Sequence, residues 1–125
     1  MQFSKAGIIL LTGRYQDCVA FYGEVLGLPL MFRLDRTDSR LTCFDLGGAY
    51  LMVEPGGSGA SQRDAAGQSR VKLRFNVENV ETSAMELRNK GVEITLRHHG
   101  WGTTAEFADP DCNRCALRSD QGFGV

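Results

Sequence analysis

The sequence predicts an α+β fold built from two βαβββ modules. Two observations support this prediction. An apolar strand-like run followed by a helical pattern that ends at a glycine occurs at residues 7–27, and the same order recurs at residues 72–91. Short strand-like runs, separated by polar or glycine-containing turns, follow each copy.

The first copy opens with the apolar run at residues 7–11 and enters a helix near Tyr15. Gly27 ends this helix, because glycine readily adopts the left-handed conformation found at helix C-termini. Pro29 limits strand pairing, so the next strand is expected at a sheet edge or with a late start. The 3.6-residue period predicts a buried helix face of Cys18, Val19, Tyr22, Val25 and Leu26. The expected strands are Leu28–Leu34, Leu41–Leu46 and Tyr50–Glu54.

The second copy follows a small, polar segment, residues 55–69, which is expected to be a linker. A lid over a binding site is the alternative for this segment. Asn79 is the expected N-cap of the second helix and Gly91 its C-terminal stop. The expected elements are Val71–Val77, the helix Val80–Lys90, Val92–His98, Thr104–Ala108 and Arg114–Ser119. We therefore predict a single domain, residues 1–125, with module 1 at about 1–54 and module 2 at about 70–120.

Composition and charge exclude several partners. The chain has a net charge of −1 and no apolar stretch near the roughly 20 residues that span a bilayer, so neither nucleic acid nor membrane is an expected partner. The N-terminus lacks a signal-peptide pattern, and we expect a cytoplasmic protein. Four cysteines in a chain with an ordinary core do not indicate a disulfide framework. The pair Cys112 and Cys115 follows a Pro-Asp turn and enters a strand, unlike a thioredoxin motif, and no further zinc ligands lie nearby in sequence. A metal or redox site at this pair is therefore the less favoured alternative.

Side chains alternate between the two faces of a strand, and this alternation separates polar from apolar residues. In the second copy, one face carries Lys72, Arg74 and Asn76 from the first strand and Arg114, Ala116 and Arg118 from the last. In the first copy, the corresponding faces carry Gly7, Ile9 and Leu11, and Tyr50, Met52 and Glu54. The basic residues either contact a ligand or form an ordinary wet sheet surface, since antiparallel sheets commonly expose one polar face.

The order of these elements, with Phe21-Tyr22-Gly23-Glu24-Val25-Leu26-Gly27-Leu28 in the first copy and Asp109-Pro110-Asp111-Cys112-Asn113 near the end, resembles the vicinal oxygen chelate superfamily. That superfamily contains glyoxalase I, extradiol dioxygenases, fosfomycin resistance enzymes and bleomycin resistance proteins. The resemblance covers nearly the whole chain. It implies that the modules form paired, curved, mixed sheets with a central cup. In this family the fourth place of the Asp-Pro-Asp motif is commonly glycine, where this chain has Cys112.

Metal-dependent relatives place His, Gln or Glu at up to four strand positions. The resemblance puts these positions at Gly7, Met52, Lys72 and Ala116. Glycine and alanine have no donor, a thioether is a poor ligand for hard cations, and an ammonium group repels them. The resemblance therefore points to the metal-free branch, without a cofactor, and away from glyoxalase, dioxygenase and thiol-transferase chemistry.

Metal-free relatives such as the bleomycin-type proteins bind a drug without chemistry, are usually homodimers, and stack planar rings on aromatic side chains. The aromatic candidates here are Tyr50, Trp101, Phe32 and Phe44, with core packing favoured for the two phenylalanines. We expect a ligand site that includes Lys72, Arg74, Arg118, Trp101, Tyr50 and Met52. A basic cup suits an anionic or aromatic ligand better than cationic bleomycin.

Two alternatives remain. A metal-independent isomerase or lyase would use Glu54 or His98 as its general base, with Lys72 or Arg118 stabilising an oxyanion. A metal enzyme with displaced ligands would draw them from the histidines, the cysteines, Glu54 and Glu106.

Overall fold

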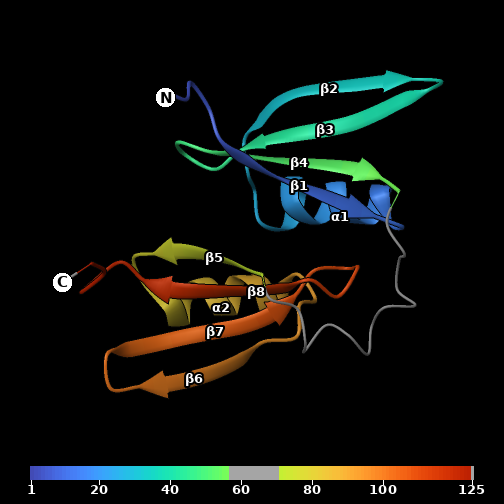
Figure 1. Cartoon of the computed structure of the whole chain (residues 1–125). Coiled ribbons are helices and arrows are strands. Elements are labelled where there is room, and N and C mark those ends of the chain that lie inside the picture. Colours follow the sequence, from blue (N-terminus) through green and yellow to red (C-terminus); the bar gives the residue numbers. More distant parts are fainter. Residues whose placement is uncertain (57–70, 125) are drawn as a thin grey trace. The chain divides into compact units, whose positions relative to one another are not determined.

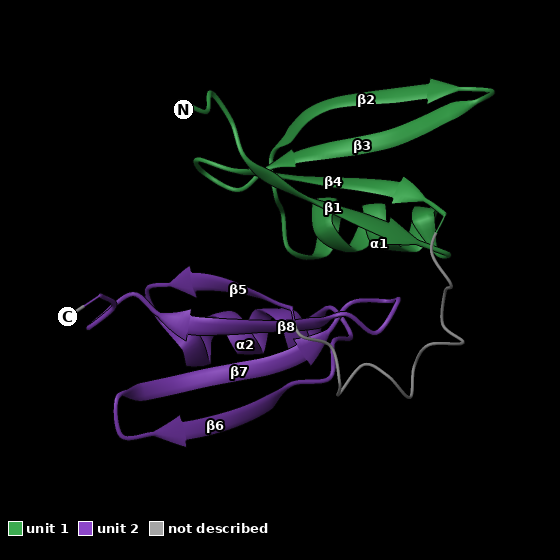
Figure 2. Cartoon of the chain, viewed as in Figure 1, with its two compact units in different colours: residues 1–62 green, residues 63–125 purple. Residues whose placement is uncertain are grey.

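The computed structural model describes residues 1–56 and 71–124. The chain divides into two compact units, Met1–Gln62 (unit 1) and Arg63–Val125 (unit 2), coloured separately in Figure 2. Apart from Pro55 and Gly56, the expected linker at residues 55–69 lies outside the described residues.

Unit 1 has the predicted βαβββ order (Figure 1). Its elements are β1 (Gly7–Thr12), α1 (Tyr15–Ala20), η1 (Phe21–Val25), β2 (Leu30–Arg36), β3 (Ser39–Asp45) and β4 (Tyr50–Pro55). The strands form a mixed sheet in the order β1-β4-β3-β2, in which β1 and β4 are parallel and the other pairs are antiparallel. The strand after Pro29 starts late, at Leu30, and lies at the sheet edge, as the proline predicts.

Unit 2 repeats this arrangement. Its elements are β5 (Lys72–Val77), α2 (Val80–Asn89), β6 (Thr95–His99), β7 (Gly102–Ala108) and β8 (Arg114–Ser119). The order β5-β8-β7-β6 matches unit 1, with β5 parallel to β8 and the other neighbours antiparallel. The α+β fold of two βαβββ modules is thereby confirmed. No helix within residues 1–56 and 71–124 is long and apolar enough to cross a membrane.

The helix ends follow the predicted local chemistry. The Asn79 side chain accepts a hydrogen bond from the Thr82 N–H at 2.9 Å, which caps α2. Gly27 and Gly91 have φ values of 74° and 90°, the left-handed conformation expected after the two helices. Asn79 thus fixes where α2 begins, and the two glycines fix where the helices end and the chain turns toward the next strand.

One feature of the first helix differs from the prediction. After Ala20 the chain adopts a π-helical turn, closed by a hydrogen bond from the Leu26 N–H to the Phe21 carbonyl at 2.9 Å. This wider turn breaks the 3.6-residue period on which the predicted helix face depends. Phe21 and Tyr22 are buried, whereas Val25 and Leu26 are only half-buried.

The core of each unit lies between its helix and one face of its sheet. In unit 1 this core includes Cys18, Phe21, Tyr22, Phe44, Leu51 and Val53. In unit 2 it includes Leu73, Val80, Ala84, Leu87, Ala105, Phe107, Cys115 and Leu117. Each sheet therefore has a helix face, packed against the helix, and an opposite face, called here the open face.

Candidate functional site

The open face of unit 2 carries the basic residues that the sequence places together. Lys72 pairs in register with Arg114, Arg74 with Ala116 and Asn76 with Arg118. Paired residues of neighbouring strands share a face, so the predicted grouping is confirmed. The open face of unit 2 comprises Lys72, Arg74, Asn76, Thr95, Arg97, His99, Thr104, Glu106, Ala108, Arg114, Ala116 and Arg118.

A short ion pair crosses this face. The Lys72 Nζ lies 2.8 Å from the Glu106 Oε1, and both side chains are partly shielded from solvent. Burial alone would raise the pKa of Glu106. Hydrogen bonds from Lys72 and Thr104, with the positive charges of Lys72 and Arg97, outweigh the burial and lower the pKa of Glu106 below its ordinary value. Lys72 is thus largely neutralised by a neighbour on its own sheet.

Arg74 differs from Lys72 in its surroundings. It lies in register with Ala116, which in turn pairs with Glu106 on β7. Arg74 is exposed, and no hydrogen bond or ion pair engages it within residues 1–56 and 71–124. Ala116 beside it has only a methyl side chain, which leaves the guanidinium accessible from above the sheet. Of the two exposed arginines on this face, Arg97 acts electrostatically on Glu106, whereas Arg74 has no interaction with a carboxylate within the described residues and can receive an anion.

Trp101 lies at the end of the same sheet, in the turn between β6 and β7, and is 52% exposed. Its ring stacks on His99 with centroids 4.6 Å apart and planes 1° apart. The Arg118 guanidinium lies 4.6 Å from the Trp101 centroid and 5.2 Å from that of Phe123. These contacts hold a large, flat, half-exposed ring next to the basic open face.

Arg118 is held in place rather than free. It is 9% exposed, and its guanidinium donates hydrogen bonds to the carbonyls of Ser119 at 2.8 Å and Gln121 at 3.5 Å. A cavity of about 500 Å³ runs from Trp101 to the start of α2, where Glu78 and Glu81 line it. The acidic side chains of Glu78 and Glu81 make this cavity an unfavourable place for the acid group of a ligand.

The open face of unit 1 is apolar by comparison. Tyr50, Met52 and Glu54 pair in register with Gly7, Ile9 and Leu11. Ile9 and Leu11 are exposed. Phe44 is buried, as expected for a core residue. The matching expectation for Phe32 is wrong: its side chain is 44% exposed, because Phe32 pairs with Cys43 and so points away from the helix.

The four strand positions at which metal-dependent relatives carry ligands occupy equivalent places in the two sheets. In the pairing of β1 with β4, Gly7 lies opposite Tyr50, and Met52 is two residues further along β4. In the pairing of β5 with β8, Lys72 lies opposite Arg114, and Ala116 is two residues further along β8. A Cβ added at Gly7 would lie 2.3 Å from the Tyr50 ring, so that ring occupies the space of a ligand side chain. Lys72 is engaged by Glu106. These four residues do not fit a metal ion.

Within the residues that the structure describes, no group of three or more His, Cys, Asp or Glu side chains is placed to hold a metal. The described residues therefore contain no cluster that would support a metal enzyme with displaced ligands.

The two candidate general bases lie on different kinds of surface. Glu54 is on the open face of unit 1, half-buried, in register with Leu11. His98 pairs with Thr103, on the opposite face of the unit 2 sheet from Lys72 and Arg74, and its Nδ1 lies 3.1 Å from the Thr103 Oγ1. His98 is therefore not positioned with the basic residues that would stabilise an oxyanion.

The Asp-Pro-Asp-Cys-Asn segment has a structural role in the turn between β7 and β8. Asp109 is buried, and its carboxylate accepts hydrogen bonds from the N–H groups of Asp111 and Asn113 and from the Asn113 side chain, at 2.8–2.9 Å. Cys112 has φ 66° and is the one non-glycine residue with positive φ in the described parts of the chain. The glycine common at this place in the family is thus explained by the backbone conformation.

Sequence reasoning missed two parts of this site. The sequence suggested Glu106 only as a displaced metal ligand, whereas in the structure it forms an ion pair with Lys72. Alternation along β7 places Glu106 on the open face, and the strand register brings it near Lys72. Phe123 lies beyond the last strand, and no periodic signal connects it with Arg118.

Comparison with known proteins agrees with the fold of the two units. Residues 6–117 match the family model described as the Glyoxalase/Bleomycin resistance protein/Dioxygenase superfamily. The uncharacterized protein YraH of Bacillus subtilis (strain 168) is 30% identical over 115 residues, covering 85% of this chain and 90% of YraH.

Two solved structures show that the fold is shared by a binding protein and an enzyme. TnmS3, an antibiotic binding protein from Streptomyces sp. CB03234, is 20% identical with a TM-score of 0.72, covering 95% of this chain and 98% of TnmS3. A lactoylglutathione lyase from Agrobacterium tumefaciens is 13% identical with a TM-score of 0.71, covering 99% of this chain and 98% of that enzyme. On the match across residues 6–117, this chain belongs to the glyoxalase/bleomycin resistance protein/dioxygenase superfamily.

Proposed function

We propose that this chain is a metal-free small-molecule binding protein of the sequestration or resistance type, acting as a homodimer. Its ligand carries a flat aromatic body and an acidic group. The acidic group pairs with Arg74, and the aromatic body lies against Trp101.

The observation that carries this proposal is the contrast between Lys72 and Arg74 on one strand. Lys72 is paired with Glu106 at 2.8 Å, whereas Arg74 has no partner within the described residues. An unpaired guanidinium and a half-exposed tryptophan on the same unit offer a charged hydrogen-bond donor and a stacking surface. The similarity of fold to TnmS3, an antibiotic binding protein, adds support for binding without chemistry.

The proposal is tested by screening aromatic carboxylates and the matching neutral amides for stabilisation against heat. We expect the acids to raise the melting temperature more than the amides. Arg74→Gln should weaken binding of the best acid about tenfold or more, because a charge-assisted hydrogen bond contributes roughly 1.5–3 kcal/mol.

The matched control is Arg88→Gln, which removes the same charge from α2 on the other side of the sheet. It should leave the dissociation constant of the acid within about twofold of the parent value. Equal losses in the two variants would show that overall charge, rather than a site at Arg74, drives binding and would contradict the proposal.

A further inference from the structure

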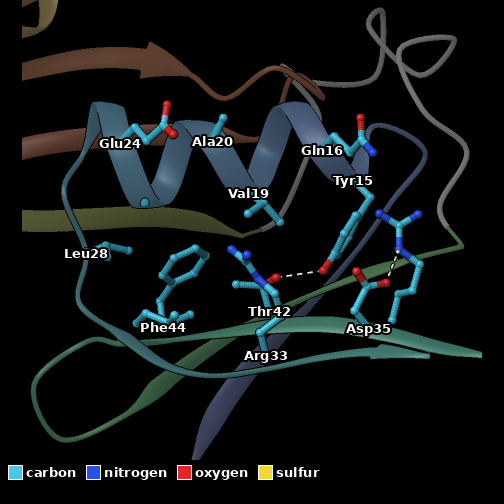
Figure 3. A pocket seen from close by; sticks show the side chains of 13 residues that line it. Tyr15, Gln16, Val19, Ala20, Glu24, Leu28, Arg33, Asp35, Thr42 and Phe44 are labelled. Carbon is cyan, nitrogen blue, oxygen red and sulfur yellow. Dashed lines mark hydrogen bonds and ion pairs between the residues drawn. The ribbon is translucent and has the colours of Figure 1, made fainter.

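The helix side of the unit 1 sheet holds a cavity that lies wholly within that unit (Figure 3). Its volume is about 440 Å³, within the 300–1,000 Å³ typical of small-molecule sites. It lies between α1–η1 and the strands β2 and β3, on the opposite face of the sheet from Tyr50 and Met52.

The walls of this cavity are mainly apolar. Phe44 forms part of its floor and is buried, while Val19 and Leu28 are half-buried at its sides. Gly23 keeps the helix close to the floor, since a Cβ there would lie 3.1 Å from the Phe44 ring. Figure 3 shows Val19 pointing from the helix toward the sheet. These surfaces suit a flat apolar body.

Two of the polar pairs that line the cavity are satisfied internally. The Tyr15 hydroxyl lies 2.7 Å from the Thr42 hydroxyl. Arg40 pairs with Asp35 at 3.6 Å, and its guanidinium lies 4.6 Å from the Tyr15 ring centroid. Neither pair has an unmet charge to offer a ligand.

Arg33 is different. Its side chain extends from β2 into the space between the sheet and the helix (Figure 3). Arg33 pairs with Thr42 across the strands, and no hydrogen bond or ion pair engages its guanidinium within the described ranges, residues 1–56 and 71–124. Glu24 also lines the cavity, but it is exposed and Figure 3 shows its carboxylate on the side of the helix away from the sheet. Arg33 is thus a positive charge without a partner that faces the cavity, next to a hydroxyl pair that can accept or donate a further hydrogen bond.

From this geometry we propose a second ligand site in unit 1, separate from the open faces, that binds a small carboxylate with an aromatic or branched apolar body. The carboxylate pairs with Arg33, and the body packs between Val19, Leu28 and Phe44. The proposal goes beyond the function proposed above, because it requires neither Arg74 nor Trp101.

The probe for this site is 2-naphthoate, with 2-naphthamide as its neutral counterpart of nearly the same shape. In an amide-resolved NMR titration, 2-naphthoate should shift the signals of Gly23, Thr42 and Phe44. Arg33→Gln should weaken that binding about tenfold or more and abolish the preference for the acid over the amide. Val19→Phe, which fills the cavity without changing charge, should abolish binding of both probes there.

The matched control is Arg36→Gln, since Arg36 lies on the same strand but does not line the cavity. It should leave the affinity within about twofold of the parent value. Undiminished binding in both Arg33→Gln and Val19→Phe would overturn the proposal. Chemical shift changes by 2-naphthoate that are confined to β5 and β8 would also overturn it. So would cavity signals that move with protein concentration alone, because these would assign this surface to contact with a second copy of the chain.

Discussion

At the scale of single residues, Cys112 is the clearest departure of this chain from its family. Its φ of 66° is a conformation that costs an L-residue roughly 1–2 kcal/mol relative to glycine. Cys112→Gly relieves this strain but also removes the contacts of a buried thiol, so we expect a net rise in the melting temperature of about 2–4 °C. Calorimetry measures this rise. Cys112→Ala is the control: it keeps the backbone strain and loses buried side-chain contacts, so it should lower the melting temperature. No rise with glycine would show that the turn relieves its strain in another way.

Glu106 provides a second residue-scale prediction. The pKa of Glu106 is lower in the folded protein than its ordinary value near 4.5, so ionised Glu106 stabilises the fold above that value. This stabilisation is lost as the pH falls from about 4.5 through the lowered pKa. Lys72→Gln removes the first hydrogen-bond donor and a nearby charge, and should raise the pKa of Glu106. Carboxyl NMR titration of both proteins measures the change, and an unchanged pKa would contradict the ion pair.

At the scale of elements, the Tyr50 ring of β4 packs so closely on Gly7 of β1 that it leaves no room for a side chain at position 7. A Cβ at Gly7 would lie 2.3 Å from the Tyr50 ring, so Gly7→Ala must displace that ring. We expect a loss of about 1–3 kcal/mol in the free energy of unfolding. In a Tyr50→Ala background the same change should be nearly neutral. Urea denaturation of the four proteins measures this coupling, and an equal cost in both backgrounds would show that the ring does not fill the space.

Much of this architecture can be predicted from the sequence because it depends on local patterns. Alternation places Lys72 and Arg74 on one face of β5, and cap chemistry places the ends of α2 at Asn79 and Gly91. The π-helical turn at Phe21 was missed because the wide turn leaves no period in the sequence. The position of Phe32 was wrong because it depends on an irregularity in pairing between Leu30 and Phe32.

The candidate sites were harder to predict than the fold. The proximity of Lys72 and Glu106 depends on strand register across three strands of unit 2. The cavity next to Arg33 depends on the distance between a strand and a helix that no sequence pattern encodes. Sequence reasoning therefore identified which face carries positive charge, but not which of those charges remain unpaired.

At the scale of the whole molecule, the four strand positions Gly7, Met52, Lys72 and Ala116 offer no suitable donor set for a metal ion. We expect elemental analysis of untagged protein to find no metal in stoichiometric amount. Addition of zinc, nickel, manganese or iron should not raise the melting temperature, since binding only to the folded state would stabilise it. One tightly bound metal per chain would contradict the assignment of these strand positions.

The function proposed for this chain requires that an acidic aromatic ligand on the open face of unit 2 contact both Arg74 and Trp101. The chain contains a single tryptophan, so its fluorescence reports on Trp101 alone. The most direct measurement titrates the best aromatic carboxylate from the screen into the parent protein and into Arg74→Gln, following Trp101 emission. Saturable quenching in the parent that shifts to at least about tenfold higher concentration in Arg74→Gln is the expected result. Identical titrations of the two proteins, or binding that leaves Trp101 emission unchanged, would contradict it.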